Sequence, residues 1–148
     1  MIDETMQLQG AMTLIVRRAS GDIETVHKDN IIVNVGFDFI ADAIGKSASR
    51  PSVMGFIALG TDTTAAAASQ SALVSELDRN AATYAHTTGT KAFSFTADFP
   101  AGDGTGAITE AGVFNAASGG IMLDRVVFPV VNKGADDSLT AVFTFTMS

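Results

Sequence analysis

The chain has 148 residues, a length that fits one domain with a full hydrophobic core. Its composition, 47% hydrophobic and 17% charged, is that of a folded protein and excludes a disordered one. The net charge of −7 disfavours binding to nucleic acids or anionic membranes, and the lack of cysteine excludes disulfides, thiolate metal sites and a cysteine nucleophile.

Residues 1–9 are polar and acidic and predict an extended arm, followed by a single domain over residues 10–148. The arm lacks the apolar stretch of a signal peptide, and apolar runs elsewhere fall short of the roughly 18 residues of a membrane span. We therefore expect a protein made in the cytosol. Within residues 11–18, Met12, Leu14 and Val16 recur at every second position, which predicts a strand with one buried face. Residues 23–28 follow after a Ser-Gly-Asp turn as the return strand of a β-hairpin. The next stretch, 31–33, extends or follows this hairpin.

Residues 34–45 are the one segment with helical periodicity. Asn34 is a candidate N-cap and Gly45 a candidate stop. Four apolar residues fall at helical spacing on one face, which we expect to cover an open end or face of the sheets: Phe37, Ile40, Ala41 and Ile44.

Residues 53–60 read as a strand buried on both faces, and a run of Thr, Ala and Ser follows from residue 61 to 71. Small side chains allow close backbone approach and lose little entropy on binding, so we interpret this loop as a surface on which a partner lies. The alternative is a mobile loop without a partner. The candidate partner-docking residues are Thr61, Asp62, Thr63, Thr64, Ser69 and Gln70.

Order resumes at residues 73–77, and further strands are predicted at 80–87, 91–99, 107–115, 121–129 and 138–147. About eight strands with turns every 8–12 residues favour a mainly β fold. We expect an antiparallel β-sandwich, jelly-roll-like, with one short α-helix. Its core should contain Ile57, Phe93, Phe95, Phe114 and Phe143.

Candidate catalytic chemistry is sparse in this sequence. His27 and His86 lie far apart along the chain and outside any metal-binding spacing, so we expect neither a catalytic set nor a metal or cofactor site. The glycine-rich stretch at 102–106 lacks the lysine of a phosphate-binding loop and reads as a turn.

Glu110 is the unusual charge, because it lies in an otherwise apolar strand and needs a partner there. Arg125 on the next strand, or Arg79, is within reach of such a pairing. We expect a structural ion pair of Glu110 and Arg125.

Three stretches, taken in order, resemble a family of small virion proteins of tailed bacteriophages. They are "NVGFDFIADAIG" (34–45), "FIALGTDTTAAAASQSALVSEL" (56–77) and the segment from "ITEAGVF" to the final alternating strand (108–146). The resemblance covers most of the chain after residue 30.

The resemblance implies a β-sandwich with a structural role and no catalysis. It suggests a capsid decoration or cement protein on the virion surface, whose partner is the major capsid protein of the same virion. We expect a homotrimer, because a clamp at a three-fold position gains avidity from repeated weak contacts. A tail-fibre or baseplate-associated module is the alternative within this family. Outside it, a small-ligand or carbohydrate-binding module and a β-sandwich enzyme with His27 or His86 in a cleft stay open.

Overall fold

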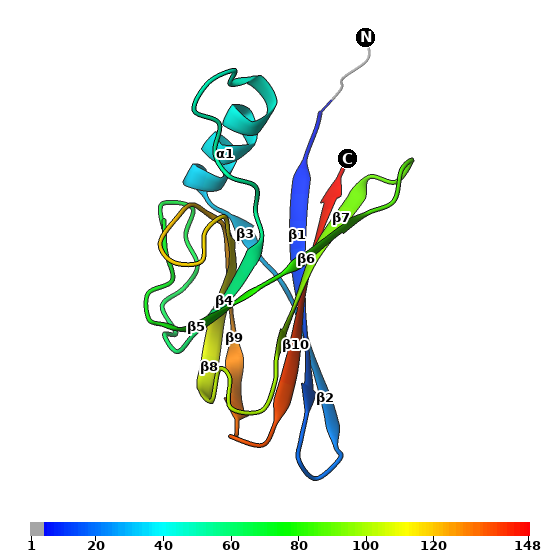
Figure 1. Ribbon diagram of the computed structural model, residues 1–148, viewed down its shortest axis with the longest axis vertical. Coiled ribbons are helices and arrows are strands. Elements are labelled where there is room, and N and C mark those ends of the chain that lie inside the picture. Colours follow the sequence, from blue (N-terminus) through cyan, green and yellow to red (C-terminus); the bar gives the residue numbers. More distant parts are fainter. Residues whose placement is uncertain (1–4) are drawn as a thin grey trace.

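The computed structural model describes residues 5–148, which form ten strands and one helix in two antiparallel five-stranded sheets packed together (Figure 1). The predicted β-sandwich with one short helix is confirmed. The elements are β1 (Leu8–Arg17), β2 (Ile23–Asp29), β3 (Ile31–Ile32), α1 (Asn34–Gly45), β4 (Phe56–Gly60), β5 (Glu76–Ala81), β6 (Thr83–His86), β7 (Ala92–Phe99), β8 (Gly106–Phe114), β9 (Met122–Lys133) and β10 (Ser138–Met147).

Sheet A has the strand order β2-β1-β10-β7-β6. Its centre is the long pairing of β1 with β10, which runs from Leu8 opposite Met147 to Arg17 opposite Ser138. Alternate residues of both strands point inward, so one face of sheet A is apolar and the other is polar. The expected hairpin is present as β1 and β2, closed by the predicted turn at residues 19–22.

Sheet B has the order β3-β9-β8-β4-β5, and its strands β4 and β8 are buried on both faces. Its inner face packs on sheet A. In the main core between the sheets, Ile57 from sheet B joins Phe95 and Phe143 from sheet A. On its outer face a smaller cluster forms around Phe114 and Leu73. Phe93 differs from expectation, because it is only half-buried at the margin of the core.

The stretch predicted as one strand at 80–87 is divided between the two sheets. β5 is an edge of sheet B and β6 an edge of sheet A, and the chain crosses between them at Ala82, whose N–H donates to the carbonyl of Gly55. β3 likewise leaves the first hairpin and pairs with β9 in sheet B. These two crossings connect the sheets and account for the strands beyond the expected eight.

Helix α1 has the predicted bounds, but its predicted buried face is wrong. Phe37, Ala41 and Ile44 are exposed, and the helix approaches β9 through Gly36. A Cβ atom on Gly36 would lie 2.3 Å from the carbonyl oxygen of Leu123, so glycine permits a contact that no larger residue allows.

The N-cap of α1 also differs from expectation. Val33, whose side chain has no hydrogen-bonding atom, occupies that position in place of Asn34. The backbone N–H of Asn34 instead donates to the carbonyl of Ala68 in the loop after β4. The loop after β4 therefore accepts a hydrogen bond from a backbone N–H group at the start of α1.

The expected arm over residues 1–9 falls partly outside the described residues, which begin at Thr5. Residues 8 and 9 belong to β1, and Gln7 exchanges two backbone hydrogen bonds with Ser148. Sheet A therefore begins at Leu8, within the segment predicted to be an extended arm.

Candidate functional site

The small-residue loop between β4 and β5, residues 61–75, lies against the outer face of sheet B and is held there by one carboxylate. Glu110 is fully buried, and its Oε2 accepts hydrogen bonds from the backbone N–H groups of Asp62 (3.0 Å) and Ser75 (2.8 Å). Its Oε1 accepts another from Val74 (2.9 Å). The carboxylate thus fixes both ends of the loop.

Arg125 completes this anchor from β9, and the structure brings it together with Glu110 as expected from their strand positions. Its Nε donates to Glu110 Oε1 at 3.0 Å, and Nη2 lies 3.0 Å from the same oxygen but outside hydrogen-bond alignment. Both side chains are fully buried, so the pair sits in a weakly screening environment. Gly60 makes room for it, because a Cβ there would lie 2.6 Å from Glu110 Oε2.

The middle of the loop is held by Arg125 and by Gln70. Arg125 Nη1 donates to the carbonyl of Thr64 (2.8 Å) and to Gln70 Oε1 (3.1 Å). The Gln70 amide also accepts from the N–H of Ala67 and donates to the carbonyl of Ala65. Gln70 therefore organises the loop from within, and its docking role stays a prediction.

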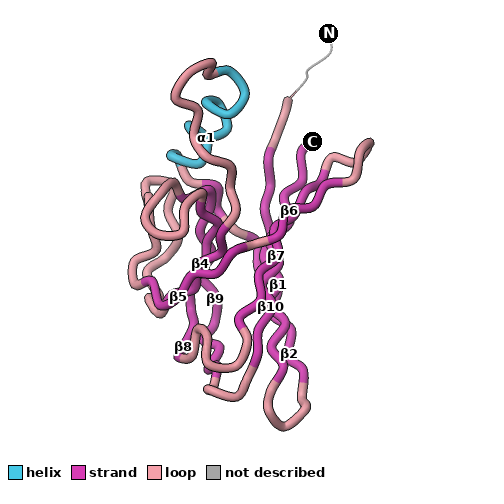
Figure 2. The backbone as a smooth tube through the Cα atoms, viewed as in Figure 1, coloured by secondary structure: helices cyan, strands magenta, loops and turns pink. Residues whose placement is uncertain are grey.

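The other candidate docking residues occupy distinct places in the loop. Thr61 bonds Ser75 across its base, and Asp62 accepts hydrogen bonds from Thr64, which hold the pKa of the Asp62 carboxyl below its usual value. Thr63, Thr64 and Ser69 are exposed. With the exposed alanines between them, they form a surface of small side chains over a fixed backbone. Figure 2 shows loop segments gathered beside β4 and β5, on the side of the molecule away from sheet A.

A second buried acid, Asp124, lies one residue before Arg125. Burial raises the pKa of its carboxyl well above the usual value, against the opposing effects of hydrogen bonds from the N–H of Val113 (3.1 Å) and from the Asn30 amide. Asn30 Oδ1 is buried and has no hydrogen-bond partner among the described residues. Our sequence reasoning missed Asp124, although an acid within "IMLDRVVF" carries the same signal as Glu110.

The two histidines lie at opposite edges of sheet A. His27 on β2 bonds Thr13 (2.9 Å), and His86 on β6 bonds the carbonyl of Ala92 (2.8 Å). Four strand spacings separate these edges, a distance of roughly 19 Å. The two imidazoles therefore cannot act on the same atom.

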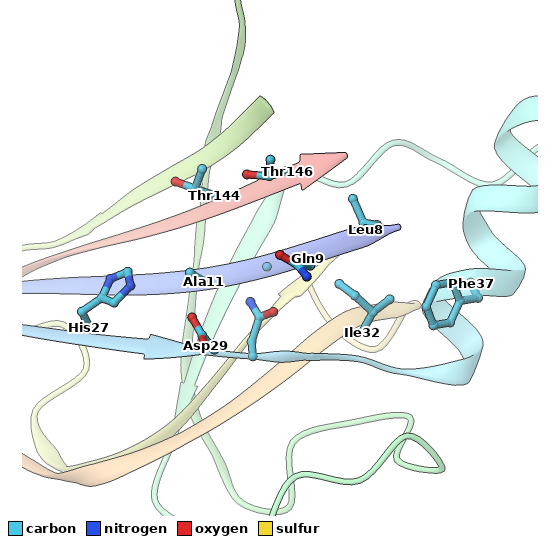
Figure 3. A pocket seen from close by; sticks show the side chains of 11 residues that line it. Leu8, Gln9, Ala11, His27, Asp29, Ile32, Phe37, Thr144 and Thr146 are labelled. Atoms are coloured by element: carbon cyan, nitrogen blue, oxygen red, sulfur yellow. The ribbon is translucent and has the colours of Figure 1, made fainter. Parts of the chain in front are cut away.

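His27 borders an open groove of about 680 Å³, lined by both polar and apolar side chains, along the first strands of sheet A and beside the start of α1 (Figure 3). The carboxylate of Asp29 and the hydroxyl groups of β10 face the same groove. These hydroxyl groups belong to Thr144 and Thr146, and the remaining labelled side chains are Leu8, Gln9, Ala11, Ile32 and Phe37.

Within residues 5–148, the His, Asp and Glu side chains form no group of three or more that could hold a metal ion. The same residues include no helix with the length and apolarity needed to cross a membrane. Comparisons with protein-family models, curated proteins and solved structures found no match.

Proposed function

We propose that this chain is a non-enzymatic structural protein of a tailed-bacteriophage virion, and that it decorates the outer surface of the capsid. In this role it contacts neighbouring major capsid subunits and holds them together. The family assignment rests on the sequence resemblance. The structural support comes from the anchored loop at residues 61–75.

The observation that carries the proposal is a loop rich in small residues that is nevertheless fixed by buried charge. Glu110 receives three backbone N–H groups from this loop, and Arg125 binds one of its carbonyl groups. A preformed backbone avoids the ordering entropy that a mobile loop would lose on binding. Small side chains add little entropy cost of their own, so such a surface suits a broad contact with another protein.

The charge of the chain fits a protein partner better than a nucleic acid. A net charge of −7 favours basic patches on the partner and raises the rate of encounter with them. We propose the major capsid protein as this partner and a trimer as the assembled form. Several weak contacts per trimer then add up to stable retention.

The proposal is tested by adding bulk and charge to the loop without removing its anchors. Ala67→Glu alters an exposed side chain, while the hydrogen bond donated by the Ala67 N–H to Gln70 is retained. Ala117→Glu, in the exposed turn between β8 and β9, is the matched control. Purified shells are mixed with each variant, and the bound copies per shell are counted.

We expect Ala67→Glu to lower occupancy at least tenfold and Ala117→Glu to leave it unchanged. Equal occupancy for both variants and the parent chain would exclude this loop as the docking surface. Recovery of the protein with tails at low copy number, and not with shells, would favour the tail-fibre or baseplate role.

The groove beside His27 supports a second candidate, a module that binds a small polar ligand such as a sugar. Its hydroxyl, amide and carboxylate groups are suited to hydrogen bonding with such a ligand. Titration with an oligosaccharide library, read by the NMR shifts of Gln9 and Thr144, tests this candidate. Unchanged shifts at both positions would reject it.

A further inference from the structure

The end of the sandwich that carries α1 contains an apolar cleft of about 440 Å³. α1 forms one wall with Phe39 and Ile40, and sheet A forms the other with Leu8, Tyr84 and Phe93. Figure 1 shows α1 at the same end of the molecule as the beginnings of β1 and β7. The cleft thus lies between the two layers of the fold.

Two large apolar side chains that line this cleft remain in contact with water. Val53 is 82% exposed and Tyr84 is 58% exposed. Exposed apolar surface of this kind marks a place where another segment binds. Its cover must be apolar itself, because the lining offers one hydroxyl group, that of Tyr84, among hydrocarbon and thioether side chains.

We propose that residues 1–5 of a second copy of this chain occupy the cleft. The segment begins with two apolar residues, Met1 and Ile2, and continues with two acids, Asp3 and Glu4. Five extended residues span about 17 Å, enough to lay a strand-like segment across a cleft of this size. Because the contact joins two copies of one chain, it is independent of the proposed virion role.

The charges around the cleft match this segment. Arg50 precedes Val53 by three residues, Lys91 precedes Phe93 by two, and both basic side chains are exposed. With Ile2 in the apolar cleft, Asp3 and Glu4 of the entering segment are proposed to pair with these two basic side chains. This complementarity favours the acidic N-terminal segment over a neutral apolar peptide.

The direction of β1 favours exchange between copies over folding back within one copy. Gln7 and Ser148 hold the chain antiparallel to β10 through two backbone hydrogen bonds, of 2.8 and 2.9 Å. To fold back into its own cleft the chain would have to reverse direction immediately before Gln7, whereas a second copy can supply the segment without a reversal.

The absence of cysteine from the chain allows a direct test of this exchange. Ile2→Cys and Val53→Cys are made in separate chains, mixed and oxidised mildly. A disulfide requires Cα atoms within about 7 Å, so a mixed disulfide dimer reports the proposed contact. Val130→Cys, exposed on β9, replaces Val53→Cys in the control mixture.

We expect the first mixture to give the mixed dimer at least tenfold faster than the control mixture. Equal rates in the two mixtures would overturn the proposal. An intrachain disulfide as the sole product of the Ile2→Cys/Val53→Cys double variant would do so as well, because it would place the segment in its own cleft.

Oligomer mass and tyrosine fluorescence give independent measurements. Tyr84 is the one tyrosine of a chain without tryptophan, so its emission reports the environment of the cleft. We expect this emission to change on dilution as the oligomer dissociates. Deletion of residues 2–5 should abolish the change and give a monomer by light scattering, and an unchanged oligomer mass after the deletion would refute the exchange.

Discussion

Replacing Glu110 with glutamine should detach the small-residue loop and destabilise the fold. The carboxylate accepts four hydrogen bonds, three from backbone N–H groups and one from Arg125 Nε. Each carboxylate oxygen accepts two of them, so an amide NH₂ in place of either oxygen faces two donors. Two lost bonds to a charged group amount to roughly 3–6 kcal/mol, in line with the about 3–5 kcal/mol for breaking a buried ion pair.

Urea denaturation followed by far-UV circular dichroism measures this loss, and hydrogen exchange measures the loop itself. We expect the amides of Asp62, Val74 and Ser75 to lose protection first, because they bond the carboxylate directly. The double variant Glu110→Leu/Arg125→Met is the control. It should be more stable than Glu110→Gln, because no unpaired charge stays buried.

A loss below about 1 kcal/mol in Glu110→Gln, with these three amides still protected, would contradict the anchoring role. The loop would then be held by its other contacts, chiefly those of Leu73 with the outer face of sheet B. The threshold corresponds to one ordinary hydrogen bond.

Three further predictions concern the core, the helix and the buried acid. Phe95→Ala should cost about 3–5 kcal/mol in urea denaturation, and a cost below about 1 kcal/mol would place this ring outside the core. Gly36→Ala should cost about 1–3 kcal/mol of stability, because the added Cβ would meet the carbonyl of Leu123. The control Gly45→Ala, at the exposed end of α1, should change stability by less than about 1 kcal/mol. Equal effects of the two variants would argue against a close approach of Gly36 to β9. Burial raises the pKa of Asp124, so the folded state keeps a proton that the unfolded chain releases above about pH 4. The free energy of unfolding therefore falls as the pH rises from about 4 toward the raised pKa of the folded state. Asp124→Asn should therefore be more stable than the parent at pH 7 and equal to it near pH 3, and a constant difference across this range would show that Asp124 ionises normally.

The strands could be predicted from the sequence because burial on a sheet repeats every two residues. In β7, Phe95, Ala97 and Phe99 are buried in alternation, as the pattern indicates. The helix bounds were predictable for a similar reason, but its buried face was not. α1 has apolar side chains around much of its circumference, and the close contact at Gly36 decides which of them face the sheets.

The anchoring of the loop could be predicted only in part. Glu110 is visible in the sequence as an acid within an apolar strand, and Arg125 as its nearest partner. The sequence does not identify the loop residues that bind Glu110, because they do so through backbone N–H groups, which nearly every residue possesses. Sequence therefore locates the anchor but not the segment that it holds.

The pairing of β1 with β10 has a consequence for synthesis on the ribosome. β1 is translated early, yet its partner on one side is made more than a hundred residues later, with Leu8 facing Met147 across nearly the whole chain. At about 5–20 residues per second, the β1–β2 hairpin waits on the order of ten seconds with its apolar face uncovered. Sheet A closes only after β10 leaves the exit tunnel, so nascent chains that stall before that point should be clients for chaperones.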